Sequence, residues 1–210
     1  STPALPYKIN EEQLQCIALF VSRLETAFPE RPDLSQPWLH PARVLMTIIM
    51  DGGGGCGKTT LSTDILLPLL ETMHSGQGLT PENSMRTHAL ALNAQTRQKL
   101  TITHVDAGAL YVDEYSQLQG ELNHAGALRT TYAREAKYGL SKDVYYKPLE
   151  RWGRLPVVVY SGDHLQLPPV PATSSMLAPL EGTTNEHKVG AKIFRDADLV
   201  FEFQQAMRFT

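Results

Sequence analysis

Residues Ile48–Thr60 have the sequence IIMDGGGGCGKTT, and this stretch decides the fold. It follows the spacing G-x-x-x-x-G-K-[ST] of a phosphate-binding loop. Glycines let the backbone approach phosphate closely. Successive backbone N–H groups, with the N-terminal end of the helix that follows, form a concave anion site. The stretch therefore predicts a nucleoside triphosphate site whose contacts come from Gly52, Gly53, Gly54, Gly55, Cys56, Gly57, Lys58, Thr59 and Thr60.

The sequence around the loop fits a strand, a loop and a helix in that order. Val44–Met50 is short, apolar and rich in β-branched residues, as in a buried parallel strand. Leu61–Leu70 has a helical pattern, although Pro68 is expected to kink or end the helix. Lys58 is expected to reach the β- and γ-phosphates, and the Thr59 hydroxyl to complete a Mg²⁺ shell. A glycine-rich turn that binds nothing is the alternative, which the agreement of strand, loop and helix disfavours.

Composition excludes several classes of protein. The chain has 210 residues, enough for one α/β domain, and its net charge of -3 gives no global nucleic-acid signature but leaves a local basic groove open. No apolar run is long enough to span a bilayer, and the first residues lack the apolar stretch of a signal peptide. Cys16 and Cys56 are the only cysteines, and no Cys/His spacing indicates a metal site. We therefore expect an intracellular protein of a reducing compartment with no membrane partner.

Apolar runs alternate with helical patterns along the chain. Asn10 is a candidate N-cap, and apolar residues recur at helical spacing in EEQLQCIALFVSRLETAF after it. Further strands are expected at Gly108–Glu114, Leu155–Gly162 and Asp198–Phe203, helices at Thr87–Leu100 and Ser116–Gly139 with an interruption near Gly126, and loops at Pro29–Ala42, His74–Thr87 and Ala172–Lys188. Strands that alternate with helices predict an α/β fold, a parallel sheet with helices on both faces.

An acidic pair ends the second predicted strand. Asp113, directly after apolar residues, can hold Mg²⁺ through water, and the adjacent Glu114 can polarise the water that attacks the phosphate. An acidic pair can also cap the next helix. Its combination with a phosphate-binding loop favours catalysis.

A third polar segment, YSGDHLQLPPVPA (Tyr160–Ala172), follows the next predicted strand. It is expected at the carboxyl edge of the sheet, where ligands bind in open α/β folds. Asp163 and Gln166 are candidates to approach the γ-phosphate or its water, since a neutral amide can sense phosphate without the desolvation cost of a charge. A turn with prolines is the alternative, and the spacing leaves it open.

Four segments occur in the order GGGGCGKT, VDEYSQ, GDHLQLPPV and FQQAMRF. Together they resemble the superfamily 1 DNA helicases of the 5′-to-3′ Pif/RecD-like group, and GD-x-x-QLPPV is the most specific of these elements. INEEQ near the N-terminus is similar to the adenine-recognition motif of that group. The resemblance implies a RecA-like P-loop NTPase fold and an ATP- and Mg²⁺-dependent motor that translocates on single-stranded DNA.

The resemblance also implies roles for individual residues: adenine contact for Gln13, phosphate binding for Lys58, Mg²⁺ binding for Thr59 and Asp113, general-base catalysis for Glu114, and γ-phosphate sensing for Gln166. Arg208, in QQAMRF, matches the family arginine that reaches the γ-phosphate from the end of the first motor domain. An arginine fork can stabilise charge spread over the equatorial oxygens. A surface arginine is the alternative.

The chain departs from the family pattern in several places. In the family, a strand and a DNA-contacting A-P-T-x-x-A-like loop normally precede the acidic pair. This loop is expected to be missing after Leu70, which leaves Thr72 and His74 as candidate DNA contacts beside an ordinary loop. His164 stands where the family has an apolar or aromatic residue, and it can stack on a base or be a loop histidine. The second motor domain is expected to be absent. We expect residues 1–42 to carry the adenine motif and connector, and residues 43–210 to form the motor domain.

Other functions stay open beside a DNA helicase motor domain. One is a non-catalytic nucleotide-binding scaffold or switch, which the presence of Lys58, Thr59, Asp113, Glu114 and Gln166 disfavours. Another is a viral-type superfamily 1 RNA helicase, which shares the phosphate loop and GD-x-x-QL, whereas LPPV and INEEQ favour the DNA group. The expected partners are single-stranded DNA and a second RecA-like domain, in the nucleus or mitochondrion if the protein is eukaryotic. The isolated chain is expected to hydrolyse ATP weakly.

Overall fold

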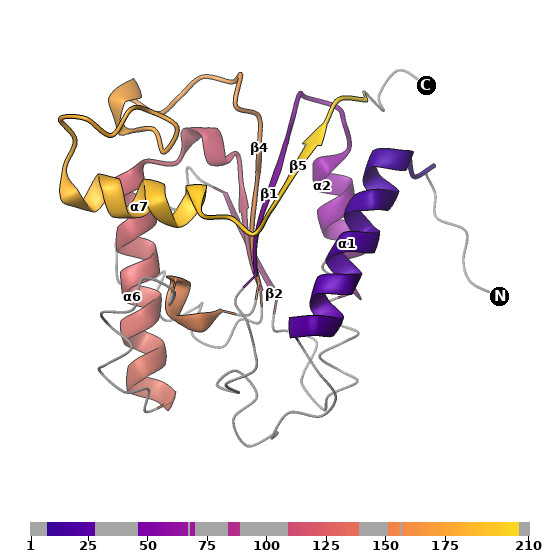
Figure 1. Ribbon diagram of the computed structural model, residues 1–210, viewed down its shortest axis with the longest axis horizontal. Coiled ribbons are helices and arrows are strands. Elements are labelled where there is room, and N and C mark those ends of the chain that lie inside the picture. The colour runs from indigo at the N-terminus through magenta and orange to yellow at the C-terminus, as the bar shows by residue number, and fades with distance from the viewer. Residues whose placement is uncertain are drawn as a thin grey trace.

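The computed structural model describes residues 8–27, 46–66, 68–69, 84–88, 109–138, 151–155 and 157–205 (Figure 1). Its helices are α1 (Glu11–Ala27), α2 (Lys58–Leu61), α6 (Gly120–Tyr138) and α7 (Asn185–Arg195), and its strands are β1 (Met46–Gly52), β2 (Ser84–His88), β3 (Ala109–Asp113), β4 (Val157–Gly162) and β5 (Leu199–Phe203). A π-helical segment, Ser62–Leu66, continues α2, and short 3₁₀ turns lie at Tyr115–Gln117, Arg151–Arg154 and Ala172–Ser174.

The strands form one parallel sheet in the order β2-β3-β4-β1-β5. In Figure 1, α1 and α2 cover one face of this sheet, and α6 and α7 cover the other. The predicted α/β fold with helices on both faces is therefore confirmed. The strand that enters the phosphate-binding loop, β1, lies inside the sheet, and β4 separates it from β3.

Alternation along the strands divides the core into two clusters. Met46, Ile48 and Met50 of β1 pack with Cys16 and Phe20 of α1 on one face. Ile49, between them, faces the other side and packs with residues of α6 and α7, because side chains alternate along a strand. Burial on both faces explains why these strands are nearly continuous apolar runs.

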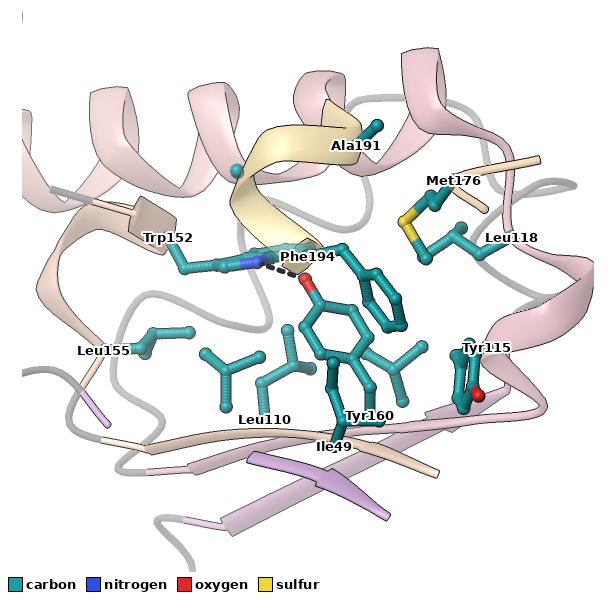
Figure 2. Packing of buried hydrophobic residues seen from close by; sticks show 13 residues of the cluster. Ile49, Leu110, Tyr115, Leu118, Trp152, Leu155, Tyr160, Met176, Ala191 and Phe194 are labelled. Carbon is teal, nitrogen blue, oxygen red and sulfur yellow. Dashed lines mark hydrogen bonds between the residues drawn. The ribbon is translucent and has the colours of Figure 1, made fainter. Parts of the chain in front are cut away.

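A chain of buried hydrogen bonds begins in the second cluster, and Figure 2 shows its first bond, from Trp152 to Tyr160. Trp152 Nε1 donates to the Tyr160 hydroxyl at 3.0 Å, which donates to Asn123 Oδ1 at 2.9 Å. Asn123 Nδ2 in turn donates to the Gly190 carbonyl of α7 at 2.9 Å. Buried polar groups need such partners, and this chain fixes α6 and α7 to the strand that precedes GDHLQLPPV.

The strand β2 corrects the expectation of a loop at His74–Thr87 followed by a helix at Thr87–Leu100. Thr87 and His88, expected to begin a helix, are the last residues of β2 and pair with Val112 and Asp113. β2 is an edge strand, and its sequence SMRTH contains one large apolar residue, so it lacks the apolar run typical of a buried strand. The rest of Thr87–Leu100, together with Pro29–Ala42, Thr72, His74 and Arg208, lies outside the described residues.

The helix α7 begins inside the segment Ala172–Lys188 that was expected to be a loop. Thr184 is its N-cap, and the Thr184 hydroxyl accepts from the His187 backbone N–H at 3.1 Å. His187, Ala191 and Phe194 are buried at helical spacing. The cap and this spacing are present in the sequence, and they are the signal that the loop interpretation missed.

The helix α6 runs from Gly120 to Tyr138 without the interruption expected near Gly126. A Cβ atom at Gly126 would lie 2.9 Å from Cη2 of Trp152, which is fully buried. Glycine is therefore present here to admit an indole ring, not to break the helix. Pro68, by contrast, follows a π-helical segment, in keeping with the distortion that a proline imposes on a helix.

Candidate active site

The loop between β1 and α2 has the backbone that its glycines predict. Gly55 and Gly57 have φ values of 88° and 82°, in the left-handed region where side chains are disfavoured. Gly52 is required for another reason: a Cβ atom there would lie 2.5 Å from the Phe203 carbonyl oxygen of β5. A Cβ atom at Gly53 or Gly54 would meet nothing within 4 Å. One side of the loop is thus packed against β5, and the other is open.

Lys58 turns back over this loop. Its Nζ donates to the Gly53 carbonyl at 3.1 Å and to the Gly52 carbonyl. The Cys56 thiol donates to the same Gly53 carbonyl at 3.0 Å, and Cys56 is 3% exposed. Lys58 Nζ also lies 3.4 Å from Cys56 Sγ. The lysine ammonium and the buried thiol therefore both hold the backbone of the loop.

Gln13 connects α1 to the loop. Asn10 caps α1, as predicted: its Oδ1 accepts from the Gln13 backbone N–H at 2.8 Å, and Gln13 Oε1 accepts from the Asn10 N–H at 3.2 Å, a reciprocal capping arrangement. Gln13 Nε2 donates to the Cys56 carbonyl at 3.3 Å. The buried Gln13 amide thus lies beside the phosphate-binding loop, with protein partners at both of its ends.

Asp113 and Glu114 lie at the carboxyl end of β3. Asp113 is buried, and its Oδ1 accepts from the Glu114 backbone N–H at 3.2 Å. Glu114 has a left-handed backbone, with φ of 56° and ψ of 47°. Its Oε2 is buried and has no hydrogen-bond partner among the described residues. Buried carboxylate oxygens need hydrogen-bond donors, and since no described residue supplies one, this oxygen can accept a hydrogen bond from a water or a ligand.

The loop after β4 is built by Asp163. Its Oδ1 accepts from the Leu165 backbone N–H at 2.9 Å, and its carbonyl accepts from the Gln166 N–H at 3.1 Å. Gly162, directly before it, lets the chain pass: a Cβ atom there would lie 2.9 Å from the Tyr115 backbone nitrogen. The Gln166 side chain is exposed, at the carboxyl edge where it was expected. The loop after β4 therefore packs directly against the turn that carries Glu114.

Asp51 is a site residue that the sequence did not reveal. It precedes Gly52 on β1 and is 7% exposed. Its Oδ1 accepts from the Tyr115 hydroxyl at 2.6 Å and from the His164 backbone N–H at 2.9 Å, and its Oδ2 contacts His164 Nδ1. Burial alone would raise the Asp51 pKa, but the hydrogen bonds from Tyr115 and His164 hold this pKa below its ordinary value.

The ligand atoms of Asp51, Asp163 and His164 all lie within 4.8 Å of one another. A cation cluster is one interpretation of such a group. However, the Asp51 carboxylate already accepts hydrogen bonds from Tyr115 and His164, so hydrogen bonding accounts for the arrangement.

The sheet register brings the predicted residues to one edge. Asp51 lies opposite Gly162, and Ser161 lies opposite Asp113. With one strand between them, the loop entrance and Asp113 are about 10 Å apart by the usual strand spacing. Oxygen donors of the kind that Mg²⁺ prefers, the Thr59 hydroxyl and the Asp113 carboxylate, are present at this edge.

Glu12 holds the segment that leads out of β5. Its Oε2 accepts from the backbone N–H groups of Gln204 and Gln205, at 3.0 and 3.2 Å. Sequence reasoning did not single out this residue. The contact ties the start of α1 to the start of QQAMRF, and Arg208 in that segment lies outside the described residues.

Comparison with known proteins gives a family match and a fold. Residues 48–131 match the family described as the viral superfamily 1 RNA helicase core domain. No curated protein matches the chain by sequence. Among the described residues, no helix combines the length and apolar character needed to cross a membrane.

Solved structures of Pif1 helicases from Bacteroides share the fold. An unliganded Pif1 has a TM-score of 0.52 at 18% identity, over 97% of this chain and 43% of that one. A Pif1 double mutant has a TM-score of 0.51 at 16% identity, over 98% of this chain and 44% of that one. A Pif1 complex with ADP-AlF3 and single-stranded DNA has a TM-score of 0.50 at 16% identity, over 97% of this chain and 43% of that one.

The chain spans less than half the length of these Pif1 chains. The predicted resemblance to superfamily 1 helicases is confirmed over residues 48–131, where the sequence matches a core domain of that superfamily. The Pif1 structures show the shared fold.

Proposed function

We propose that this chain is the first motor domain of an ATP-dependent helicase, which binds ATP with Mg²⁺ and hydrolyses it to drive movement on single-stranded DNA and duplex unwinding. The observation that carries the proposal is the buried Glu114 oxygen without a partner among the described residues. It lies next to Asp113, at the sheet edge where the phosphate-binding loop begins. A scaffold that only binds nucleotide does not need this carboxylate.

Each residue at this edge has a proposed chemical role. Lys58 and the backbone N–H groups of the loop bind the phosphates. Glu114 Oε2 accepts a proton from the attacking water and orients it in line with the bond that breaks. Gln166 senses the γ-phosphate, and Arg208 stabilises the charge that develops on its oxygens. Gln13 places the adenine next to α1.

Thr59 and Asp113 are proposed to hold Mg²⁺. Their hydroxyl and carboxylate oxygens are hard donors, which suit this ion. Bound there, the ion would supply charge neutralisation on the phosphates. The adjacent Glu114 does not bind the ion in this arrangement, so its carboxylate can accept the proton from the water.

The proposed partners are single-stranded DNA and a second RecA-like domain. They are supported by the Pif1 structure solved with ADP-AlF3 and single-stranded DNA, and by the share of the Pif1 chains that this chain leaves uncovered. We place the motor domain at residues 43–210, with residues 1–42 supplying α1. The free cysteines Cys16 and Cys56 support a reducing compartment, the nucleus or mitochondrion if the protein is eukaryotic.

A second candidate is an RNA helicase motor domain, because the family that matches residues 48–131 is described as a viral RNA helicase core. The two candidates share the ATP site and differ in the polymer. Hydrolysis stimulated by single-stranded RNA but not by single-stranded DNA of the same sequence would favour this second candidate.

The test is Mg²⁺-dependent binding and hydrolysis of ATP by the chain, with and without single-stranded DNA, beside Lys58→Ala and Glu114→Gln. We expect Lys58→Ala to lose nucleotide binding. We expect Glu114→Gln to keep binding within about threefold and to lose hydrolysis by roughly 100- to 1,000-fold, as when a catalytic base is removed. Glu181→Gln, at an exposed position remote in sequence from this edge, is the matched control and should change neither quantity.

The outcomes separate the candidate functions. Binding that survives Glu114→Gln, with hydrolysis lost, supports a motor domain. Binding without any hydrolysis above the Glu114→Gln level, even with polymer present, would favour a nucleotide-dependent scaffold. Absence of nucleotide binding would refute the proposal.

A further inference from the structure

The Asp51 carboxylate touches two segments that the proposed reaction uses separately. Tyr115 is the residue directly after Glu114, and His164 lies two residues before Gln166. Both donate hydrogen bonds to Asp51. Asp51 itself is the residue before Gly52, at the start of the phosphate-binding loop. One carboxylate thus joins the phosphate-binding loop, the turn that carries Glu114 and the loop that carries Gln166.

The hydrogen bonds have a definite direction. The Asp51 pKa lies below its ordinary value, so the side chain is ionised at neutral pH and only accepts hydrogen bonds. His164 Nδ1 must then carry a hydrogen toward Asp51 Oδ2, while the His164 backbone N–H and the Tyr115 hydroxyl donate to Oδ1. Charge-assisted hydrogen bonds of this kind are shorter and stronger than neutral ones.

Tyr115 is also fixed from its other side. Its ring lies 4.9 Å from the ring of Phe194 in α7, and it packs over Gly162. Figure 2 shows Tyr115 at the edge of the buried cluster near Phe194. The core therefore sets the position of the ring, and Asp51 sets the position of the hydroxyl, so the backbone at Glu114 has little freedom to shift.

We propose that Asp51 is a positioning residue, which acts through Tyr115 and His164 to hold the Glu114 turn and the Gln166 loop in register with the phosphate-binding loop. The inference rests on the proposed ATP hydrolysis. Asp51 touches neither nucleotide nor water in this role. Its loss therefore lowers the hydrolysis step and leaves nucleotide affinity nearly intact, because small displacements of a catalytic group slow chemistry far more than binding.

The test compares Tyr115→Phe, His164→Ala and Asp51→Ala with the unaltered chain, under single-turnover conditions with protein in excess over ATP. Tyr115→Phe removes one hydroxyl and keeps the ring on Phe194. We expect each single change to slow hydrolysis roughly 10- to 100-fold while the Kd for ATP stays within about threefold. Tyr132→Phe, which removes a hydroxyl from an exposed tyrosine of α6, is the matched control and should have no effect.

The decisive measurement is whether the effect of Tyr115→Phe on the hydrolysis rate depends on the presence of Asp51. Tyr115→Phe introduced into the Asp51→Ala chain should slow hydrolysis no further, since the partner of the hydroxyl is already gone. Fully additive effects of the two changes would overturn the proposal. So would a loss of ATP affinity in step with a loss of thermal stability, because that pattern indicates a general structural role.

The Lys58→Ala chain separates failure of this inference from failure of the proposed function. If the unaltered chain hydrolyses ATP faster than Lys58→Ala, but Tyr115→Phe hydrolyses it at the unaltered rate, the positioning role is wrong and the motor proposal stands. If the unaltered chain binds or hydrolyses ATP no better than Lys58→Ala, both are wrong.

Discussion

The contact between Gly126 and Trp152 depends on the absence of a side chain. A Cβ atom at Gly126 would lie 2.9 Å from the indole ring, and Trp152 is buried and hydrogen-bonded to Tyr160, so the ring has no room to retreat. We expect Gly126→Ala to lower the free energy of unfolding by about 1–2 kcal/mol, since overpacking outweighs the better helix propensity of alanine.

Urea denaturation of Gly126→Ala and of Gly54→Ala measures this effect. Nothing lies within 4 Å of a Cβ atom at Gly54, so that change serves as the control and should leave the unfolding midpoint nearly unchanged. An unaltered midpoint in Gly126→Ala would mean that Trp152 has another position available.

Single residues also show how much of the site a sequence can reveal. Some site residues belong to motifs that are continuous in the sequence, so their positions at one sheet edge could be predicted: Lys58, Thr59, Asp113 and Glu114. Asp51 belongs to no such pattern. Its partners lie 64 and 113 residues away in the sequence, and only the parallel register of β3, β4 and β1 brings them together.

At the scale of elements, strength of pattern decided which predictions held. The strands β1, β3, β4 and β5 were predicted because they are apolar, and the structure confirms each within a few residues. β2 is polar and at the edge, so it lacks the continuous apolar signal of a buried strand and needs its neighbour β3 to be assigned. The helix α7 differs, because its cap and its apolar spacing are present in the sequence but lie in a segment of mixed composition.

The start of α1 contains a contact that can be tested at this scale. Glu12 accepts two backbone hydrogen bonds from the segment after β5, whereas its neighbour Glu11 is exposed. We expect Glu12→Ala to lower the free energy of unfolding by about 1–3 kcal/mol, the usual range for hydrogen bonds to a charged group. Glu11→Ala should cost under about 0.5 kcal/mol, as for an ordinary surface change.

Thermal denaturation followed by circular dichroism compares the two variants. Hydrogen exchange at the amides of Gln204 and Gln205 adds a local measurement, which should quicken in Glu12→Ala only. Equal effects of the two substitutions would mean that the stabilisation comes from negative charge near the N-terminus of α1, and not from the hydrogen bonds that Glu12 accepts from Gln204 and Gln205.

At the scale of the whole molecule, Cys16 makes the free energy of unfolding depend on pH in the alkaline range. Burial raises the pKa of this thiol from 9.0 to about 12. Below pH 9 the thiol is protonated in both the folded and the unfolded chain. Above pH 9 only the unfolded chain releases the proton, so the free energy of unfolding should fall by up to about 1.4 kcal/mol per pH unit until pH 12.

Urea denaturation at intervals from pH 8 to about pH 11 tests this slope, and Cys16→Ala is the control. The variant should be less stable at pH 8 but lose stability less steeply as the pH rises. Some slope should remain, since burial, and then the hydrogen bond to Asp51, also raise the pKa of Tyr115. Identical slopes in the two proteins would show that Cys16 ionises without unfolding.

The left-handed backbone at Glu114 has a consequence for how this sequence can change over generations. A side chain in that conformation costs about 1 kcal/mol or more that a glycine would avoid. Selection for a sturdier fold alone would therefore replace Glu114 by glycine, and selection for turnover opposes that replacement. A lineage released from the need to hydrolyse nucleotide would be expected to lose this glutamate early, and to become more heat-resistant as it does so.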